Sequence, residues 1–302
     1  MAEKIHFTFL GTGSAIPTAK HNHPSLLLQY KDENILIDCG EGTQRQIRVA
    51  HLNPCKITKI LITHWHGDHV LGLPGLLQTL MFSNYNKQLD IYGPKGTKKM
   101  TELYLSLFVG KSDQLKIQVH ELENNDIIDE KDFFISCKSM SHDTESLAYS
   151  FNIKEKTRIN KAKLKKLKIP NSPLIAQLLQ GKTIEINKKK INPKNLLYKE
   201  QARKITIIMD TKFNQNAVNL AENSDILISE ATYSAQEKEL AQNHFHLTSA
   251  DSAEIARKSH AKKLILTHLS QRYEINPKII LNEAKKIFKN TIIAEDFMKF
   301  EI

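Results

Sequence analysis

Residues 60–69 read Ile-Leu-Ile-Thr-His-Trp-His-Gly-Asp-His. The apolar run at the start of this stretch predicts a short buried strand. The strand gives way at once to four side chains of the kind that bind metals, His64, His66, Asp68 and His69. Successive side chains of an extended segment alternate in direction, so His64 and His66 point to the same side. A polar loop with scattered histidines is the plainer interpretation, but this spacing favours a site for two metal ions with nitrogen and oxygen ligands.

Three further predicted strands also end in a ligand-type residue. The segment 135–141 leads to His142, 205–209 leads to Asp210, and 264–267 leads to His268. Taken singly, such a residue is more often part of a turn. Together with the clustered loop, the three suggest strand ends that converge on one cleft between two sheets.

The chain has 302 residues and a net charge of +10, and this excess is concentrated in one segment. Between Lys154 and Lys190 there are twelve Lys or Arg and two Glu, while the rest of the chain has 31 basic and 31 acidic residues. A solvated helix or a disordered linker would also be rich in lysine. Beside a metal site, the concentrated charge favours binding of a polyanion such as a nucleic acid. We expect residues 154–200 to form a basic arm inserted into a single domain, 1–302.

Cysteine content and hydropathy indicate the compartment. The three cysteines, Cys39, Cys55 and Cys137, are too few and too widely spaced for a disulfide framework. No apolar run approaches the length of a membrane span, and the N-terminus lacks the apolar segment of a secretory signal. We expect a cytoplasmic protein with no membrane partner and no nucleotide cofactor.

The periodicity of the chain predicts alternating strands and helices. Helices are expected in the body at 73–82, 98–108, 215–223, 234–242, 248–259 and 277–289, with a last strand at 291–295. In the arm, 161–168 and 172–179 are expected to form a small hairpin of helices, because leucines and isoleucines recur there.

The motif His64-x-His66-x-Asp68-His69 resembles the signature of the metallo-β-lactamase superfamily. With Phe9-Leu-Gly-Thr-Gly-Ser-Ala-Ile-Pro-Thr18 before it and Asp38-Cys-Gly-Glu-Gly-Thr-Gln44 between, the chain resembles the ribonuclease Z family, which processes the 3′ end of transfer RNA. The resemblance covers nearly the whole chain. It implies an α+β fold, a four-layer αββα sandwich with an inserted basic arm.

The resemblance also assigns metal ligands. It implies two Zn²⁺ ions per subunit, although His and Asp ligands suit other divalent metals too. His64, His66 and His142 would bind the first ion, Asp68, His69 and His268 the second, and the carboxylate of Asp210 would bridge them.

Two short segments, Ser229-Glu-Ala-Thr232 and His246-Leu-Thr248, resemble loops that supply a proton donor in the family. A Glu230–His246 pair would protonate the leaving 3′-oxygen, and Asp68 would serve as a base for the attacking water. Structural interpretations remain open: Glu230 could be an acid at a helix N-terminus, and His246 a neighbour of a helix cap. His244 is not expected to take part.

Substrate contacts are predicted for the loop after the first strand and for the arm. The loop contributes Thr18 and Lys20, and the arm contributes Lys161, Lys163, Lys165 and Lys166. Ala19 and His21 stand where the family commonly has Lys and Arg, which bears on the choice of cleavage site. Ser172 and Ala176 replace glycines of the arm's turn.

The resemblance therefore implies removal of the 3′ trailer from precursor tRNA by a homodimer that holds the tRNA body with the arm. Three alternatives remain open at this point. A small-molecule phosphodiesterase would not need the arm, a general single-strand nuclease would cut unstructured RNA, and a metal-stabilised RNA-binding protein would not cleave.

Overall fold

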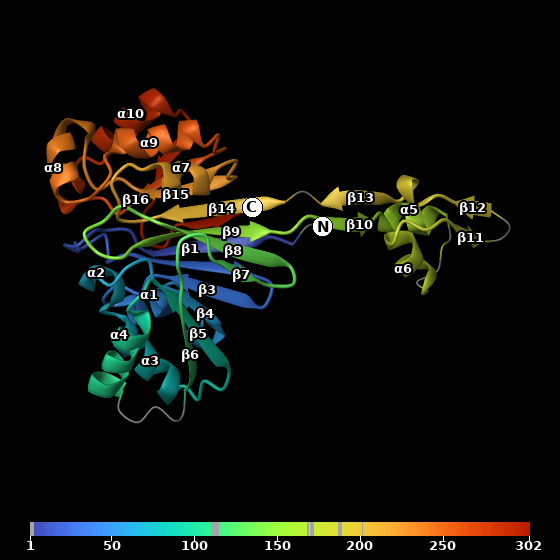
Figure 1. Cartoon of the computed structure of the whole chain (residues 1–302), viewed down its shortest axis with the longest axis horizontal. Coiled ribbons are helices and arrows are strands. Elements are labelled where there is room, and N and C mark those ends of the chain that lie inside the picture. Colours follow the sequence, from blue (N-terminus) through green and yellow to red (C-terminus); the bar gives the residue numbers. More distant parts are fainter. Residues whose placement is uncertain (1–2, 110–114, 168, 170–171, 187–188, 201) are drawn as a thin grey trace.

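A computed structural model describes residues 3–109, 115–167, 169, 172–186, 189–200 and 202–302. The chain forms a layered body from which a narrow arm projects (Figure 1). In the body two sheets lie face to face, and helices cover the outer side of each. This is the four-layer αββα sandwich predicted from the sequence.

The first sheet has seven strands and includes the strand that leads into the metal loop. Its neighbours are, in order, β18 (Lys299–Glu301), β1 (Ile5–Gly11), β2 (Ser25–Tyr30), β3 (Glu33–Ile37), β4 (Lys59–Leu61), β5 (Gln88–Gly93) and β6 (Lys116–Glu121). The helices α1 (Thr43–Val49), α2 (Gly67–Val70), α3 (Leu73–Phe82) and α4 (Thr97–Tyr104) lie on its side of the body (Figure 1).

The second sheet also has seven strands. In order they are β17 (Thr291–Ile293), β16 (Leu264–Thr267), β15 (Ile226–Glu230), β14 (Arg203–Ile208), β9 (Leu147–Ile153), β8 (Phe133–Ser139) and β7 (Ile127–Asp129). The helices α7 (Gln215–Ala221), α8 (Lys238–Asn243), α9 (Ser249–Lys258) and α10 (Lys278–Ile287) lie on its outer side (Figure 1).

Successive side chains along each strand pack on opposite faces of the sheet. In β3, Ile35 and Ile37 belong to the cluster between the two sheets, whereas Leu36 faces the helices α1 and α3. A period of two places successive side chains on opposite faces, so a sheet covered on both sides needs apolar residues at every position. The strands that carry the metal site are therefore buried on both faces, which holds their ends in place.

The described residues of the arm form four strands, two α-helices and a short 3-10 turn, Pro193–Asn195. A two-stranded stalk, β10 (Lys156–Ile159) and β13 (Leu197–Glu200), continues outward from β9 and β14. Beyond it lie α5 (Lys161–Lys166), α6 (Leu174–Leu179) and the hairpin β11 (Ile184–Ile186) and β12 (Lys189–Ile191). Leu164, Leu178 and Leu196 form part of a separate small core.

Some predicted elements were wrong in extent or kind. The helix expected at 98–108 ends at Tyr104 and continues as one π-helical turn, Leu105–Val109. The strand expected at 291–295 as the last of the chain ends at Ile293 and is not the last. A further strand, β18, follows it and pairs with β1 near the N-terminus. The two helices expected in the arm at 161–168 and 172–179 are present as α5 and α6, with Lys168 outside the described residues. The four strands of the arm were not predicted, because lysines obscure their alternation.

Candidate metal centre

The seven predicted ligands lie together at one end of the sandwich. They follow the C-terminal ends of β4, β8, β14 and β16. The first ligand after each strand is His64, His142, Asp210 and His268, respectively, and only His268 follows its strand directly. Two groups form, each with ligand atoms within 4.8 Å of one another: His64, His66, His142 and Asp210, and Asp68, His69, Asp210 and His268. The grouping agrees with the assignment implied by the resemblance, and Asp210 belongs to both groups.

The carboxylate of Asp210 faces the two groups with different oxygens. Its Oδ2 lies 3.6 Å from His64 Nε2, and its Oδ1 lies 3.5 Å from His69 Nε2 and 3.3 Å from His268 Nε2. Ligands about 2.0–2.1 Å from a tetrahedral metal are roughly 3.3–3.4 Å apart. The spacing is therefore that of two metal sites joined by one carboxylate.

Three buried atoms at this point have no hydrogen-bond partner among the described residues: His64 Nε2, His69 Nε2 and Asp210 Oδ1. A buried polar atom without a partner costs free energy, and such atoms are rare unless an ion satisfies them. Since all three aim at the centre of the groups, this donor set fits a pair of divalent cations. Its imidazoles and carboxylates suit zinc and other borderline metals.

A buried carboxylate, Asp38, organises the histidines of the first sheet. Its Oδ2 accepts hydrogen bonds from His69 Nδ1 at 2.8 Å and from Thr63 Oγ1 at 2.8 Å, and Thr63 Oγ1 in turn lies 3.1 Å from His64 Nδ1. These contacts leave both Nε2 atoms directed at the metal position. The prediction from sequence quoted Asp38 within a motif but gave it no role. Its φ of 56°, in a region that Asp tolerates better than most residues, is visible only in the structure.

A matching arrangement serves His268 on the second sheet. Its Nδ1 lies 2.9 Å from Thr232 Oγ1, which donates to Glu230 Oε2 at 2.5 Å. Both sheets therefore use a carboxylate and a threonine hydroxyl to hold a histidine ring. Thr232, like Thr63, was not among the predicted site residues.

Glu230 also holds the predicted proton donor. Its Oε2 lies 3.0 Å from His246 Nδ1, and its Oε1 accepts the Thr211 backbone N–H at 2.8 Å. Glu230 is fully buried at the end of β15, and α8 begins only at Lys238, so it is not a helix N-terminal acid. The N-cap of α9 is Thr248, paired with Asp251, so His246 does lie next to a helix cap, but its ring contacts Glu230 and not the capping residues.

His142 and His66 are oriented by groups that the sequence did not reveal. His142 Nδ1 lies 3.1 Å from the carbonyl oxygen of Phe245, whose φ of 59° is unusual for an aromatic residue. His66 Nδ1 lies 3.2 Å from His142 Nε2, and His66 Nε2 lies 3.4 Å from the carboxylate of Asp143. His66 therefore presents Nδ1 towards His142, and the same oxygen of Asp143 also lies 3.2 Å from His142 Nε2.

Burial and charge shift several pKa values here. Burial lowers the pKa of His64 well below its usual value, which favours the neutral imidazole that binds metals. Burial alone would lower the pKa of His246, but the charges of Glu230 and Asp210 raise it to about 9. This shift favours the doubly protonated imidazolium form of His246 at neutral pH. Burial opposes ionisation of Asp68, yet His69 and His268 hold the pKa of its carboxyl far below the usual range.

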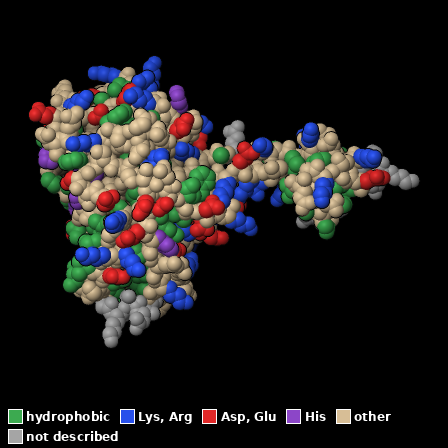
Figure 2. Space-filling view, in the orientation of Figure 1, with side chains coloured by type: hydrophobic (Ala, Val, Ile, Leu, Met, Phe, Trp, Pro, Cys, Tyr) green, Lys and Arg blue, Asp and Glu red, His purple; other side chains and the backbone are tan. Residues whose placement is uncertain are grey.

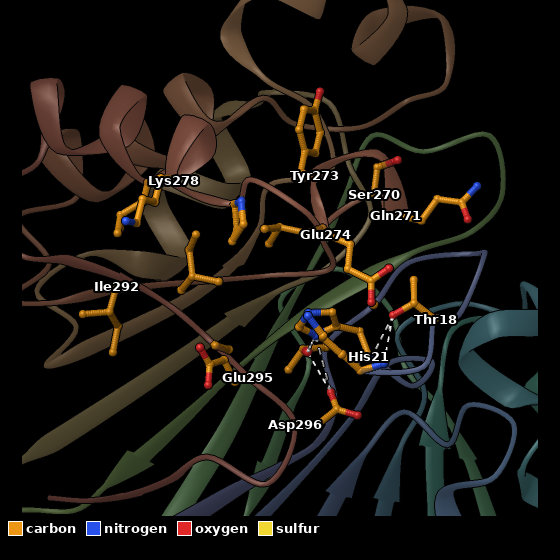
Figure 3. A pocket seen from close by; sticks show the side chains of 18 of the residues that line it. Thr18, His21, Ser270, Gln271, Tyr273, Glu274, Lys278, Ile292, Glu295 and Asp296 are labelled. Carbon is orange, nitrogen blue, oxygen red and sulfur yellow. Dashed lines mark hydrogen bonds and ion pairs between the residues drawn. The ribbon is translucent and has the colours of Figure 1, made fainter.

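The predicted substrate-binding residues lie apart from the ligands. Thr18 and Lys20 line a cavity next to the metal cleft (Figure 3). Lys161, Lys163, Lys165 and Lys166 lie on α5 in the arm, which extends away from the body (Figures 1 and 2). His244 is not in the ligand groups and packs near Tyr233, with ring centroids 6.3 Å apart.

The fold and site define a class, the metallo-β-lactamase-fold hydrolases. A solved structure of this fold, YhfI from Bacillus subtilis, is 17% identical, with a TM-score of 0.73 over 100% of both chains. A family model described as Anti-Pycsar protein Apyc1 matches residues 5–163, which include five of the seven predicted ligands but not Asp210 or His268.

The full-length relatives are more specific. Ribonuclease Z from Methanothermobacter thermautotrophicus is 37% identical over 99% of this chain and 97% of its own length, and that from Bacillus velezensis is 36% identical over 99% of both. Human tRNase Z, short form, is 27% identical, with a TM-score of 0.71 over 98% of both chains. The chain belongs to the ribonuclease Z family. It is a metal-dependent endoribonuclease of the tRNA 3′-processing type.

Proposed function

We propose that the protein removes the 3′ trailer of precursor tRNA by one hydrolytic cut, leaving a 3′-hydroxyl on the tRNA and a 5′-phosphate on the trailer. The main support is the shared carboxylate of Asp210, whose two oxygens face two separate groups of histidines. A pair of cations so placed can neutralise a phosphodiester and activate water for attack on phosphorus.

We further propose that two Zn²⁺ ions occupy the site in each subunit. His64, His66 and His142 would hold one, Asp68, His69 and His268 the other, and Asp210 both. Asp38 and Glu230 would keep the ring nitrogens His69 Nδ1 and His268 Nδ1 protonated, the latter through Thr232, so that Nε2 remains a ligand atom.

The chain's own side chains would handle the protons. Asp68 Oδ2 lies 3.4 Å from both His69 Nε2 and His268 Nε2, so it borders the position where water would bind. Asp68 would orient that water and is the candidate base for its proton, although, against the opposing effect of burial, the neighbouring His69 and His268 lower its pKa and so weaken it as a base. His246 uses Nδ1 to contact Glu230, which leaves Nε2 to deliver a proton to the departing 3′-oxygen.

The arm would hold the tRNA body through its phosphates. Lys161, Lys165 and Lys166 are exposed on α5, whereas the ammonium of Lys163 also donates to the Asn195 carbonyl oxygen at 2.9 Å. Binding by shape and phosphate contacts requires no base sequence. Thr18 and Lys20 would contact nucleotides close to the cut.

We also propose a homodimer in which each arm serves the other subunit's cleft. The arm extends away from its own body (Figure 1), and exposed apolar side chains gather on α3, α4 and the π-helical turn, among them Phe82, 78% exposed, Leu107 and Phe108. Mixing an armless variant with an Asp210→Ala variant should restore cleavage, because one mixed dimer site then has both parts. No recovery in a mixture shown to form mixed dimers would contradict the exchange of arms.

The chain is proposed to act in the cytoplasm. Cys39, Cys55 and Cys137 are all unpaired, which suits a reducing compartment. In the described part of the chain, no helix has the length and hydropathy needed to cross a membrane.

The test is cleavage of a 3′-extended precursor tRNA by zinc-loaded protein, with both product ends mapped. An unstructured RNA of equal length and the small diester bis(p-nitrophenyl) phosphate are the comparison substrates. A single cut after the acceptor stem, absent from the linear RNA, is the expected result. Equal cutting of both RNAs would indicate a general nuclease, cutting of the diester alone a small-molecule phosphodiesterase, and RNA binding without any cutting a non-catalytic binder.

A further inference from the structure

A cavity of about 730 Å³ opens beside the metal cleft, whose own volume is about 530 Å³. The two share Ser270 and Gln271 as lining residues, so they adjoin directly. Three segments wall the cavity: the loop of residues 12–21, the segment 269–281 that leads into α10, and residues 292–297. Its volume lies within the range of pockets that take one small organic ligand.

The floor of the cavity is held rigidly by a buried carboxylate. Asp296 accepts hydrogen bonds from Thr12 Oγ1 at 2.7 Å, the Asn22 backbone N–H at 2.9 Å and Gln46 Nε2 at 3.0 Å. His21 joins this network through Thr12 Oγ1, at 2.8 Å from its Nδ1. Figure 3 shows His21 and Asp296 linked at the base of the cavity. These groups are therefore committed to holding the loop and are not available to a ligand.

Four other charged side chains line the cavity without a partner. Lys20, Glu274, Lys278 and Glu295 form no ion pair and no side-chain hydrogen bond within the residues that the structure describes. Leu281, Ile292 and Ile293 supply an apolar wall between them. Figure 3 shows Glu274 and Lys278 on one wall, and Ile292 and Glu295 on the facing one. The cavity thus offers an apolar surface, two hydrogen-bond acceptors and two cations.

This combination fits a nucleobase better than a phosphate. Two carboxylates repel a phosphate group, whereas a carboxylate readily accepts a hydrogen bond from the exocyclic amino group of cytosine. The apolar wall can cover the face of a base, and Lys20 and Lys278 can contact the phosphates on either side. Glu274 is half-buried and Glu295 is exposed. Because an unmade hydrogen bond costs more at a buried group, Glu274 should distinguish more strongly between bases with and without an amino group.

We propose that this cavity is a subsite for one unpaired nucleobase next to the scissile phosphate, and that Glu274 selects a base with an amino group over uracil. The proposal rests on the proposed function, since the RNA must pass the adjoining cleft. The base belongs either to the last nucleotide of the tRNA or to the first nucleotide of the trailer. Both have the same chemistry, and the experiment distinguishes them.

The first test is single-turnover cleavage of four precursor tRNAs, with cytosine or uracil at each of the two positions. The wild-type protein should cleave the uracil substrate with roughly tenfold lower efficiency at one position, as expected for one lost hydrogen bond to a charged group. Glu274→Gln should reduce this ratio to about one, because an amide can both donate and accept. Glu239→Gln, the same change on the exposed surface of α8, should keep the wild-type ratio.

The second test locates the base by fluorescence. We would place 2-aminopurine at either position and bind the RNA to the non-cleaving Asp68→Ala protein. The emission should rise only for the position that leaves the stack and enters the cavity, and Glu274→Ala in the same background should weaken binding of that RNA.

Two outcomes would overturn the subsite: a cytosine-to-uracil ratio near one at both positions in the wild type, or an unchanged ratio in Glu274→Gln. Correct cleavage of precursor tRNA would in either case leave the proposed function intact. If the wild type fails to cut any precursor, the proposed function fails, and the 2-aminopurine signal still decides whether the cavity takes a base.

Discussion

The metal cleft and the arm solve two different problems of recognition. In the cleft, side chains from the ends of four strands are buried and tied by hydrogen bonds, and Asp210 is only 4% exposed. In the arm, a small core of its own supports α5, on which Lys161, Lys165 and Lys166 are exposed to solvent. Chemistry on one phosphate needs fixed geometry, whereas attraction to many phosphates needs charge and reach. Changes in the cleft should therefore affect the chemical step, and changes in the arm should affect binding and its salt dependence.

The largest effect is expected at the shared carboxylate. Asp210→Ala removes an oxygen from each metal position, and a bound metal is worth several kcal/mol in the transition state, so the rate should fall by roughly a thousandfold or more. Elemental analysis should show a lower metal content. Asp32→Ala, in the exposed turn between β2 and β3, is the matched control and should retain both. A fully metallated, active Asp210→Ala protein would contradict the assignment of Asp210 as a ligand shared by two metal ions.

His246→Ala should lower the rate of the chemical step by about a hundredfold to a thousandfold while metal content stays unchanged, because only the proton donor is lost. A substrate with sulfur in place of the bridging 3′-oxygen separates this role from others. A thiolate leaves without protonation, so wild type and variant should cleave that substrate at similar rates. A defect of equal size on both substrates would assign His246 to positioning.

Removing the arm should separate the binding of precursor tRNA from the chemical step. Ile153 on β9 pairs with Arg203 on β14, so a two-residue turn can join them and delete the residues between. KM for precursor tRNA should rise roughly a hundredfold through lost phosphate contacts, while turnover of bis(p-nitrophenyl) phosphate stays the same. A parallel loss on the small diester would mean that the arm also supports the cleft.

Asp38→Asn tests the hydrogen bonds behind the ligands. The amide keeps the size of the side chain but weakens the hold on His69 and Thr63, so zinc affinity should fall by about 10- to 100-fold. Competition with a chromogenic chelator measures this directly. Unchanged affinity would reduce Asp38 to a structural role in the loop.

The smallest effects belong to single lysines of the arm. Lys165→Ala and Lys166→Ala should each weaken precursor binding a few-fold and reduce the slope of log K against log salt by about one. Lys163→Ala should have a smaller effect on that slope, since its ammonium is partly engaged by Asn195. If every variant has the wild-type slope of log K against log salt, the phosphates of the RNA do not contact these lysines of α5.

The sequence could predict whatever depends on local pattern. The apolar run at residues 60–62 marks a short buried strand, and the spacing from His64 to His69 marks a ligand loop. The strand ends pointed to His142, Asp210 and His268, which the structure brings to one place. In the arm the same reasoning found the two helices but missed the strands β10 to β13, because lysines interrupt their alternation.

By itself, the sequence determined the set of candidate ligands and the location of the charge, since each follows from the order of residues along one element, while the layered fold was implied by its resemblance to a known family. Only the tertiary structure decided which groups hold those ligands in place: Asp38 behind His69, Thr232 behind His268, Phe245 behind His142. It also created the cavity lined by Glu274 and Lys20. These pairs are far apart along the chain, and no local periodicity records a hydrogen bond or a wall that forms only when two sheets pack together.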